Sequence, residues 1–154
     1  MDHELQYELY CVTDPEFYDR LTADVTEDHL LAPLRKDATP AGWNRITTAG
    51  WVNYLPPGGE IPAQGWKVHV SSTVEQVEDV ARQVFDYCVA NLLMFKVVPT
   101  AREYFGRNAK YGERAGGGKL VTVYPENEGR LEAVVLELGK VLAGVPGPYV
   151  LSDL

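Results

Sequence analysis

The sequence predicts an α+β domain in which a small mixed or antiparallel sheet packs with about three to four helices. Short apolar or alternating segments, which are typical of strands, recur near residues 66–71, 92–98 and 120–124. Apolar residues at every third or fourth position, typical of amphipathic helices, mark residues 72–91 and 127–142. A chain of 154 residues that is 45% hydrophobic is long enough for one domain with a real core.

We expect one domain over residues 1–154, made of an acidic segment (1–37), a Pro/Gly-rich loop region (38–65) and the core that carries the site (66–154). In the first segment, residues 5–11 alternate like a weak strand, and Asp14-Pro15-Glu16 is a possible helix start. The second segment reads as loop, with room for a short strand at Trp51-Val52-Asn53-Tyr54.

The clearest predicted helix follows, because Ser72 and Glu75 have the spacing of a capping box. Its apolar stripe is Val77, Val80, Ala81, Val84 and Cys88, so Cys88 is interpreted as core packing rather than as a nucleophile. The helix is expected to end near Asn91.

The remaining elements are shorter, apart from the last helix. We expect a buried strand over Leu92–Val98, ended by Pro99, a short helix from Thr100 to about Arg107, and a basic glycine-rich loop up to Lys119. A strand over Leu120–Tyr124 comes next. Asn127 is the expected cap of a helix whose apolar face is Leu131, Val134, Val135, Leu138, Val141 and Leu142, and 147–154 resembles one more strand.

The charge is uneven along this acidic chain, whose formal net charge is −8. Six of its fourteen lysine and arginine residues fall within residues 96–119, against two acidic residues. A nucleic acid needs many spread phosphate contacts, which overall acidity opposes, so a local pocket for one small anion is the better interpretation.

Several other classes are disfavoured by simple patterns. No apolar run approaches the roughly 20 residues of a membrane span, and the N-terminus lacks the basic start of a signal peptide. Two cysteines and three histidines without metal-ligand spacing predict neither a disulfide framework nor a metal site. We therefore expect a cytoplasmic protein without a membrane or nucleic-acid partner, and with no cofactor.

Lys67 and His69 are two residues apart in a predicted strand, so their side chains share one face, while Trp66, Val68 and Val70 face a core. One of the pair is a fixed cation and the other titrates near neutral pH. An exposed edge strand that happens to carry a Lys and a His explains this pair equally well.

Lys96 lies within the apolar segment Met94-Phe95-Lys96-Val97-Val98. Burial of an ammonium is costly, so the interpretation without a functional role is that Lys96 faces solvent from an edge strand or extends its amine to water. The cationic run that follows favours the functional interpretation, in which partial burial and neighbouring cations lower the pKa of Lys96 enough for a general base.

These cations, with a candidate acid and a candidate base, match the needs of phosphate β-elimination. That reaction requires a base for the Cα proton, an electrophile near the carbonyl, and an acid with cations at the leaving phosphate. The chain lacks a carboxylate pair with glycosidase character, a Gly-x-Ser-x-Gly motif and a Walker A motif.

The same residues carry a family resemblance over roughly residues 40–153. The motifs, in order, are Gly65-Trp66-Lys67-Val68-His69-Val70-Ser71, Phe95-Lys96, Asn108-x-Lys110, Arg114, Gly118-Lys119, Val121-x-Val123-Tyr124-Pro125 and Gly147-Pro148-Tyr149-Val150-Leu151-Ser152-Asp153. Together they resemble the N-terminal lyase domain of class III and IV lanthipeptide synthetases. Its Lys-x-His element is similar to that of the phosphothreonine lyases that some bacterial pathogens inject into host cells.

The resemblance implies a phosphothreonine-lyase-like fold and a metal-independent lyase that converts phosphoserine or phosphothreonine of a precursor peptide to dehydroalanine or dehydrobutyrine. Its partners would be that peptide, leader and core, and the kinase and cyclase domains of the synthetase, which this chain lacks. The implied catalytic residues are Lys96 as base, His69 as acid and Lys67 near the carbonyl or phosphate. The implied phosphate ligands are Arg114, Lys119, Lys110 and Arg107, and the possible substrate contacts are Tyr124 and Asn108.

A second hypothesis uses the same cations without catalysis. In it, the domain only binds the phosphorylated peptide or its leader, with help from a surface formed by Trp43, Trp51 and Tyr54. A module of this kind needs the phosphate cations alone, whereas a lyase also needs a base and an acid. The chain offers both Lys96 and His69, which favours the lyase.

Overall fold

The computed structural model describes residues 29–48, 50–59, 65–107 and 118–145. Five strands form one sheet: β1 (Asn44–Thr48), β2 (Trp51–Leu55), β3 (Val68–Val70), β4 (Met94–Val97) and β5 (Val121–Tyr124). The α-helices are α2 (Val77–Ala90), α3 (Ala101–Arg107) and α4 (Glu128–Val141), and short 3₁₀ turns lie at Ala32–Leu34 (η2), Lys36–Ala38 (η3) and Val74–Gln76 (η4). The α+β fold predicted from the sequence is confirmed.

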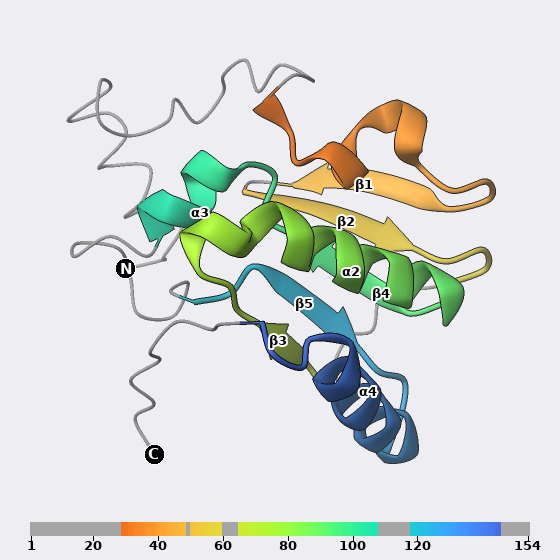
Figure 1. The fold of residues 1–154 in the computed structure, drawn as a ribbon. Helices are drawn as coiled ribbons and strands as arrows, with labels where there is room; N and C mark the ends of the chain where they lie inside the picture. The colour runs from red at the N-terminus through yellow and green to blue at the C-terminus, as the bar shows by residue number, and fades with distance from the viewer. Residues whose placement is uncertain (1–28, 49, 60–64, 108–117, 146–154) are drawn as a thin grey trace, which may run out of the picture.

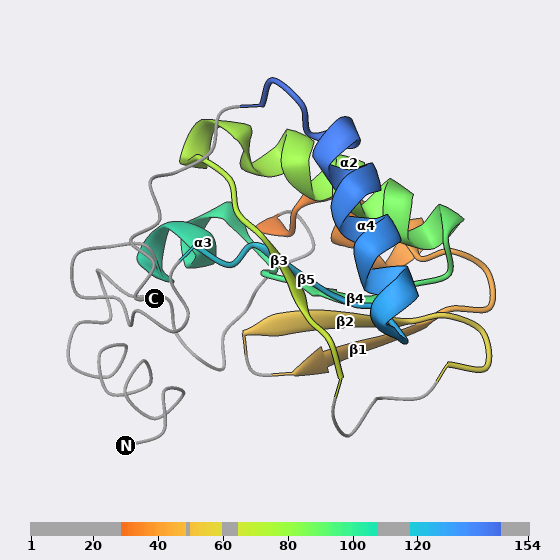
Figure 2. The same ribbon diagram turned by 90° about the horizontal axis from the view of Figure 1, so that it is seen from below.

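The sheet is antiparallel at every pairing and has the strand order β1-β2-β4-β5-β3. Strand β4, which carries Lys96, is therefore in the centre, and β3, which carries His69, is at an edge. Figure 1 shows α2 lying across the sheet. In Figure 2, α2 and α4 lie on the same side of the sheet, and α3 lies beyond one end of the strands.

The core fills the space between the sheet and these helices. Tyr54 and Phe95, on neighbouring strands, stack with ring centroids 4.9 Å apart. Phe85 of α2 meets both rings edge-on, at 5.1 Å and 5.4 Å, and Trp43 meets Phe95 at 6.1 Å. Since Phe95 faces the helices, the next residue of β4, Lys96, faces the opposite side of the sheet. In the described part of the chain, no helix covers that side, which we call the open face.

The two long helices follow the apolar spacing of the sequence. All five residues of the predicted stripe on α2 are buried, Cys88 among them, and burial raises the pKa of its thiol. Asn127 caps α4 as predicted, because its side-chain oxygen accepts a hydrogen bond of 2.8 Å from the backbone N–H of Arg130. On α4 only part of the predicted face is buried: Val134 and Leu138 are inside, whereas Val135 and Val141 are exposed.

Two predictions, one about the start of α2 and one about Trp66, were wrong. The helix begins at Val77, and neither Ser72 nor Glu75 forms a capping box. The backbone of Ser72 instead pairs with the side chain of Tyr104, whose hydroxyl donates to the Ser72 carbonyl (2.6 Å) and accepts from its N–H (2.9 Å). Trp66 does not face the core as expected, because it precedes β3 and is 49% exposed.

The loop region predicted over residues 38–65 contains a complete hairpin. Strands β1 and β2 pair from Asn44↔Leu55 to Thr48↔Trp51, so the short strand expected at Trp51–Tyr54 has a partner that the sequence did not reveal. Trp43 and Tyr54 are buried in the core, which removes them from the aromatic surface suggested for the second hypothesis. The predicted strand at 92–98 begins only at Met94, since Leu92 is an exposed turn residue with a φ of 53°.

The elements predicted at 5–11, 14–21 and 147–154 lie outside the described residues, as does most of the glycine-rich loop. In the described part of the chain, no helix has the length and apolar character needed to cross a membrane.

Candidate active site

A row of polar side chains crosses the open face of the sheet. In the strand register, His69 of β3 is opposite Thr122 of β5, Thr122 is opposite Lys96 of β4, and Lys96 is opposite Asn53 of β2. Partners opposite each other in a sheet project to the same face. The register therefore places the predicted base and the predicted acid on one face, separated by a single strand.

Lys96 occupies the centre of this row. The edge-strand interpretation of this lysine is wrong, because β4 is paired on both sides by β2 and β5. Its side chain is half-buried, and its Nζ lies 4.2 Å from the centroid of the Trp51 ring, within the range of a cation–π contact. A central strand thus holds an amine at the surface of the open face.

His69 is on the exposed edge strand, with its ring turned toward the row. Its Nδ1 is 3.2 Å from Oγ1 of Thr122, which is only 1% exposed. The pKa of His69 is lowered below its usual value, first by partial burial of the ring and then by the charges of Lys119, Lys67 and Lys96. These three lysines therefore act on the imidazole electrostatically, as expected where cations gather around one anion site.

Lys119 and Lys67 come from the segments that lead into β5 and β3, two neighbouring strands of the row. Lys119 lies two residues before β5, and Lys67 directly precedes β3. Tyr124 is the last residue of β5, and partial burial raises the pKa of its phenol. Because Thr122 and Tyr124 are two residues apart in one strand, Tyr124 also belongs to the open face.

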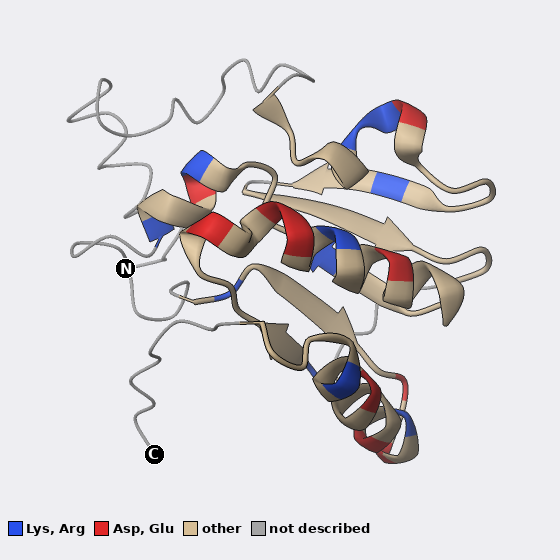
Figure 3. Ribbon diagram, viewed as in Figure 1, with Lys and Arg blue, Asp and Glu red and all other residues tan. Residues whose placement is uncertain are grey.

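The helical layer carries more acidic than basic residues. Figure 3 shows both kinds along α2 and α4, where the acidic residues Glu78, Asp79, Asp86, Glu128, Glu132 and Glu137 outnumber the basic residues Arg82, Arg130 and Lys140. The open face instead receives Lys67, Lys96 and Lys119. An anionic substrate is accordingly attracted to the open face rather than to the helices.

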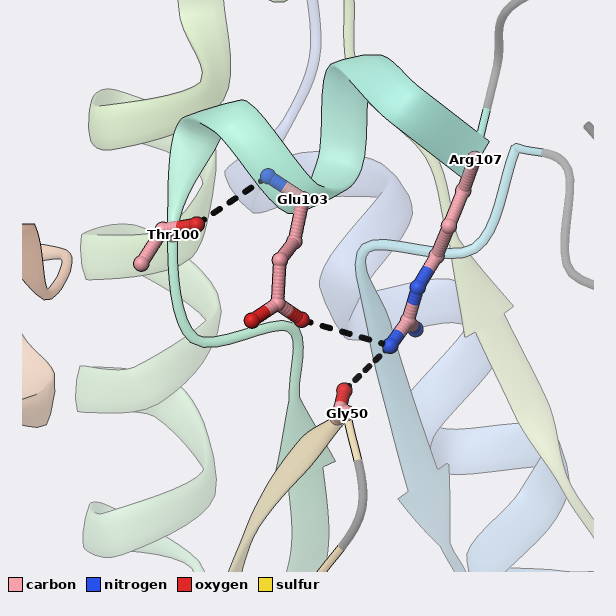
Figure 4. Close-up of polar contacts among 4 residues, drawn as sticks. All are labelled: Gly50, Thr100, Glu103 and Arg107. Atoms are coloured by element: carbon pink, nitrogen blue, oxygen red, sulfur yellow. Dashed lines mark hydrogen bonds and ion pairs between the residues drawn. The ribbon is translucent and has the colours of Figure 1, made fainter. Parts of the chain in front are cut away.

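Arg107, expected to bind phosphate, makes three contacts at the end of α3. It donates a hydrogen bond to the carbonyl of Gly50, forms an ion pair of 3.6 Å with Glu103, and places its Cζ 4.6 Å from the Trp51 ring centroid. Figure 4 shows the contacts of Arg107 with Gly50 and Glu103, together with the hydrogen bond of 3.0 Å that Thr100 Oγ1 accepts from the Glu103 N–H. Arg107 thereby joins α3 to the β1–β2 turn.

The remaining predicted site residues, Asn108, Lys110 and Arg114, lie outside the described residues. Thr122, which was not predicted from the sequence, contacts His69, and Trp51, which was expected only at the surface of the second hypothesis, contacts Lys96. A signal for Thr122 was available, since it is a hydroxyl in the otherwise apolar run Val121-Thr122-Val123.

The arrangement suits proton transfer next to a bound anion. A primary amine and an imidazole on one face can remove and deliver a proton, and the lysines around them can balance negative charge. Over residues 29–48, 50–59, 65–107 and 118–145, no three His, Cys, Asp or Glu side chains are grouped for a metal ion.

The chain resembles known proteins over most of its length. The family description "RamC, N-terminal domain" matches residues 31–154. A relative described as a probable SapB synthase of Streptomyces coelicolor (strain ATCC BAA-471 / A3(2) / M145) is 44% identical over 151 residues. That match covers 96% of this chain but 16% of the relative, so the chain spans a small part of the relative's length.

Among solved structures, the type III effector and phosphothreonine lyase OspF from Shigella flexneri has a similar fold, with a TM-score of 0.51 and 17% sequence identity. The match covers 98% of this chain and 81% of that structure. This likeness confirms the phosphothreonine-lyase-like fold, and the family match confirms the resemblance found in the sequence. The chain belongs to the family of RamC N-terminal domains.

Proposed function

We propose that this domain is a phosphopeptide lyase that removes phosphate by β-elimination from phosphoserine or phosphothreonine in a lanthipeptide precursor. The observation that carries the proposal is the register His69–Thr122–Lys96, which puts an acid and a base on one face of the sheet. The phosphothreonine-lyase-like fold and the synthase relative support it.

In this reaction Lys96 accepts one proton and His69 donates another. The neutral amine of Lys96 takes the Cα proton of the phosphorylated residue, and the electron pair of that bond becomes the Cα–Cβ double bond. The Cβ–O bond breaks, and His69 gives its proton to the departing phosphate oxygen. The products are a dehydrated residue and phosphate, with Lys96 protonated and His69 neutral, so proton exchange with water restores both groups.

The spacing of the row fits a substrate between the two groups. Neighbouring strands are about 4.8 Å apart, so the Cα atoms of Lys96 and His69 are separated by about 10 Å. Their long side chains approach the substrate from two sides above Thr122. The proton that leaves Cα and the oxygen that departs from Cβ are on adjacent substrate atoms, which suits this separation.

The lowered pKa of His69 has a direct consequence for the acid step. The free site disfavours the imidazolium, because the ring is partly buried and Lys119, Lys67 and Lys96 are close enough to act on it. A phosphate dianion bound among these lysines balances their charge and favours the imidazolium. We infer that substrate binding itself charges the acid.

The phosphate is held by cations that flank the row. Lys119 is the main described candidate, because it lies two residues before β5 and its charge acts on His69. By resemblance, Arg114 and Lys110 complete the set, Arg107 is a further ligand, and Lys67 stabilises the enolate or the phosphate. Tyr124 and Asn108 are proposed substrate contacts.

The domain is proposed to act within a larger synthetase, since it corresponds to 16% of its relative. A kinase domain would supply the phosphorylated residue, and a cyclase domain would add cysteine to the dehydrated product. The precursor peptide, with leader and core, is the partner. No metal ion has a role in this mechanism, because the base, the acid and the charge stabilisation all come from side chains.

The test is to incubate the purified chain with a phosphoserine peptide and a metal chelator and to follow the peptide by mass spectrometry. We expect loss of phosphoric acid and a dehydroalanine product, with full activity in the chelator. Serine in place of phosphoserine would mean hydrolysis and would overturn the proposal. An unchanged peptide that binds, even with the leader peptide and kinase present, would favour the second function, a binding module.

A further inference from the structure

Trp51 lies against the side chain of Lys96 on the open face. It is the first residue of β2, two positions before Asn53, which is opposite Lys96. Its indole is therefore diagonal to Lys96 on the same face, a position within reach of long side chains. The Lys96 Nζ is 4.2 Å from the ring centroid.

The indole is itself held in place by Arg107, whose Cζ lies 4.6 Å from the same ring centroid. Arg107 donates to the carbonyl of Gly50, the residue before Trp51, and pairs with Glu103 at 3.6 Å. Gly50 has a φ of 75°, and a Cβ there would collide with the Arg107 guanidinium. This turn therefore requires glycine, and the position of Trp51 is fixed from α3.

We propose that Trp51 is a positioning residue for Lys96, which holds the amine over the open face beside Thr122 and His69. The inference rests on the proposed function, because it concerns the base of that reaction. The indole is held by Arg107 at one side and meets Lys96 at the other, so the base is placed by residues of β2 and α3 as well as by its own strand.

An aromatic ring suits this task better than a carboxylate. Its negative face attracts an ammonium and accepts no proton, so it stabilises the ammonium that forms when Lys96 takes the Cα proton. A carboxylate partner would hold the ammonium more strongly and would stabilise the state that cannot act as a base. Trp is also the most effective ring for such a contact.

The first part of the test measures the contact without reference to activity. In protein labelled with ¹³C-lysine, the ring current of Trp51 should shift the Hε protons of Lys96 upfield from those of the exposed Lys140. Trp51→Leu should abolish this shift, and Trp51→Phe should retain part of it. Trp66→Leu, a matched change at an exposed tryptophan, should leave it intact.

The second part measures elimination. Trp51→Leu should lower kcat about 10-fold, which corresponds to about 1.4 kcal/mol, within the range of cation–π contacts. Trp51→Phe should recover most of that loss. The dissociation constant for a peptide with a phosphonate in place of the phosphate ester, which cannot eliminate, should stay unchanged, because Lys119 is unaltered and Arg107 keeps its contacts with Gly50 and Glu103.

The possible results distinguish the positioning role of Trp51 from the proposed lyase function. An unshifted Lys96 resonance in the unaltered protein, or a kcat that is equal in all three proteins, would overturn the positioning role. A Trp51→Leu variant that loses peptide binding as much as kcat would overturn it too, since that pattern belongs to a general structural defect. If the unaltered chain does not eliminate phosphate, the proposed function fails, and the ring-current shift still decides whether Trp51 holds Lys96.

Discussion

The hydrogen bond between Thr122 and His69 gives a sharp prediction for the substitution Thr122→Val. Thr122 Oγ1 is 3.2 Å from Nδ1 of His69, and Thr122 is buried, so valine can occupy the same space without the hydroxyl. In the imidazolium, Nδ1–H donates to this oxygen, which leaves Nε2–H directed to the substrate. The change removes the group that orients the acid, and it keeps a β-branched side chain suited to a strand.

The size of the effect follows from that single contact. A hydrogen bond to a charged group contributes about 1.5–3 kcal/mol, which is a factor of about 10–160 in a rate constant. We expect kcat to fall by that factor for Thr122→Val while KM changes little, because Lys119 and the other phosphate cations remain. The melting temperature should change little as well, because His69 is on an exposed edge strand and its ring can form hydrogen bonds with water instead.

The assay compares initial rates of dehydroalanine formation by mass spectrometry for Thr122→Val and for Thr122→Ser. Serine keeps the hydroxyl and should retain most of the activity. If Thr122→Val has the full kcat, or if Thr122→Ser falls as far as Thr122→Val, the hydroxyl does not position His69 and the reasoning is refuted.

Four further predictions concern the base, the pKa of the acid, the pH dependence of stability and the core. Lys96→Ala should abolish elimination but leave binding of the phosphonate peptide largely intact, whereas Lys119→Ala should weaken that binding; equal losses of binding would contradict the role given to Lys96. Inorganic phosphate and Lys119→Ala should each raise the pKa of His69, measured by NMR titration, because each offsets a positive charge that lowers it. The pKa of His69 is lower in the folded than in the unfolded chain, so the unfolded chain binds more protons. His69 therefore makes the free energy of unfolding fall as the pH drops from about 6.5 through the folded-state pKa. His69→Gln should weaken this pH dependence, measured by urea unfolding. Phe95→Ala should reduce the free energy of unfolding by about 3–5 kcal/mol, because it removes the ring that meets Trp43, Tyr54 and Phe85.

Much of the fold could be read from local patterns. The stripe on α2 and the Asn127 cap of α4 both depend on residues within a few turns of one another, and both are present in the structure. The prediction that Lys67 and His69 belong to the same site was also local in origin, because both residues lie in one short segment. Lys96 was conspicuous as a charge in an apolar strand.

The parts that could not be predicted depend on partners distant in the sequence. Strand β1 is mostly exposed, so its residues lack the alternation that marks a half-buried strand. The capping-box spacing at Ser72 was overridden by Tyr104, which occupies both backbone groups of that residue. Trp51 and Thr122 acquire their roles only through the strand register, which brings them beside Lys96 and His69.

The oxygen atoms of the released phosphate test the central claim most directly. The chain would be incubated with a phosphoserine peptide in H₂¹⁸O, and both products would be examined by mass spectrometry. Elimination breaks the Cβ–O bond without water, so we predict phosphate free of solvent oxygen together with a dehydroalanine peptide. Phosphate that contains one ¹⁸O atom, with serine restored in the peptide, would show attack of water at phosphorus and would contradict the account.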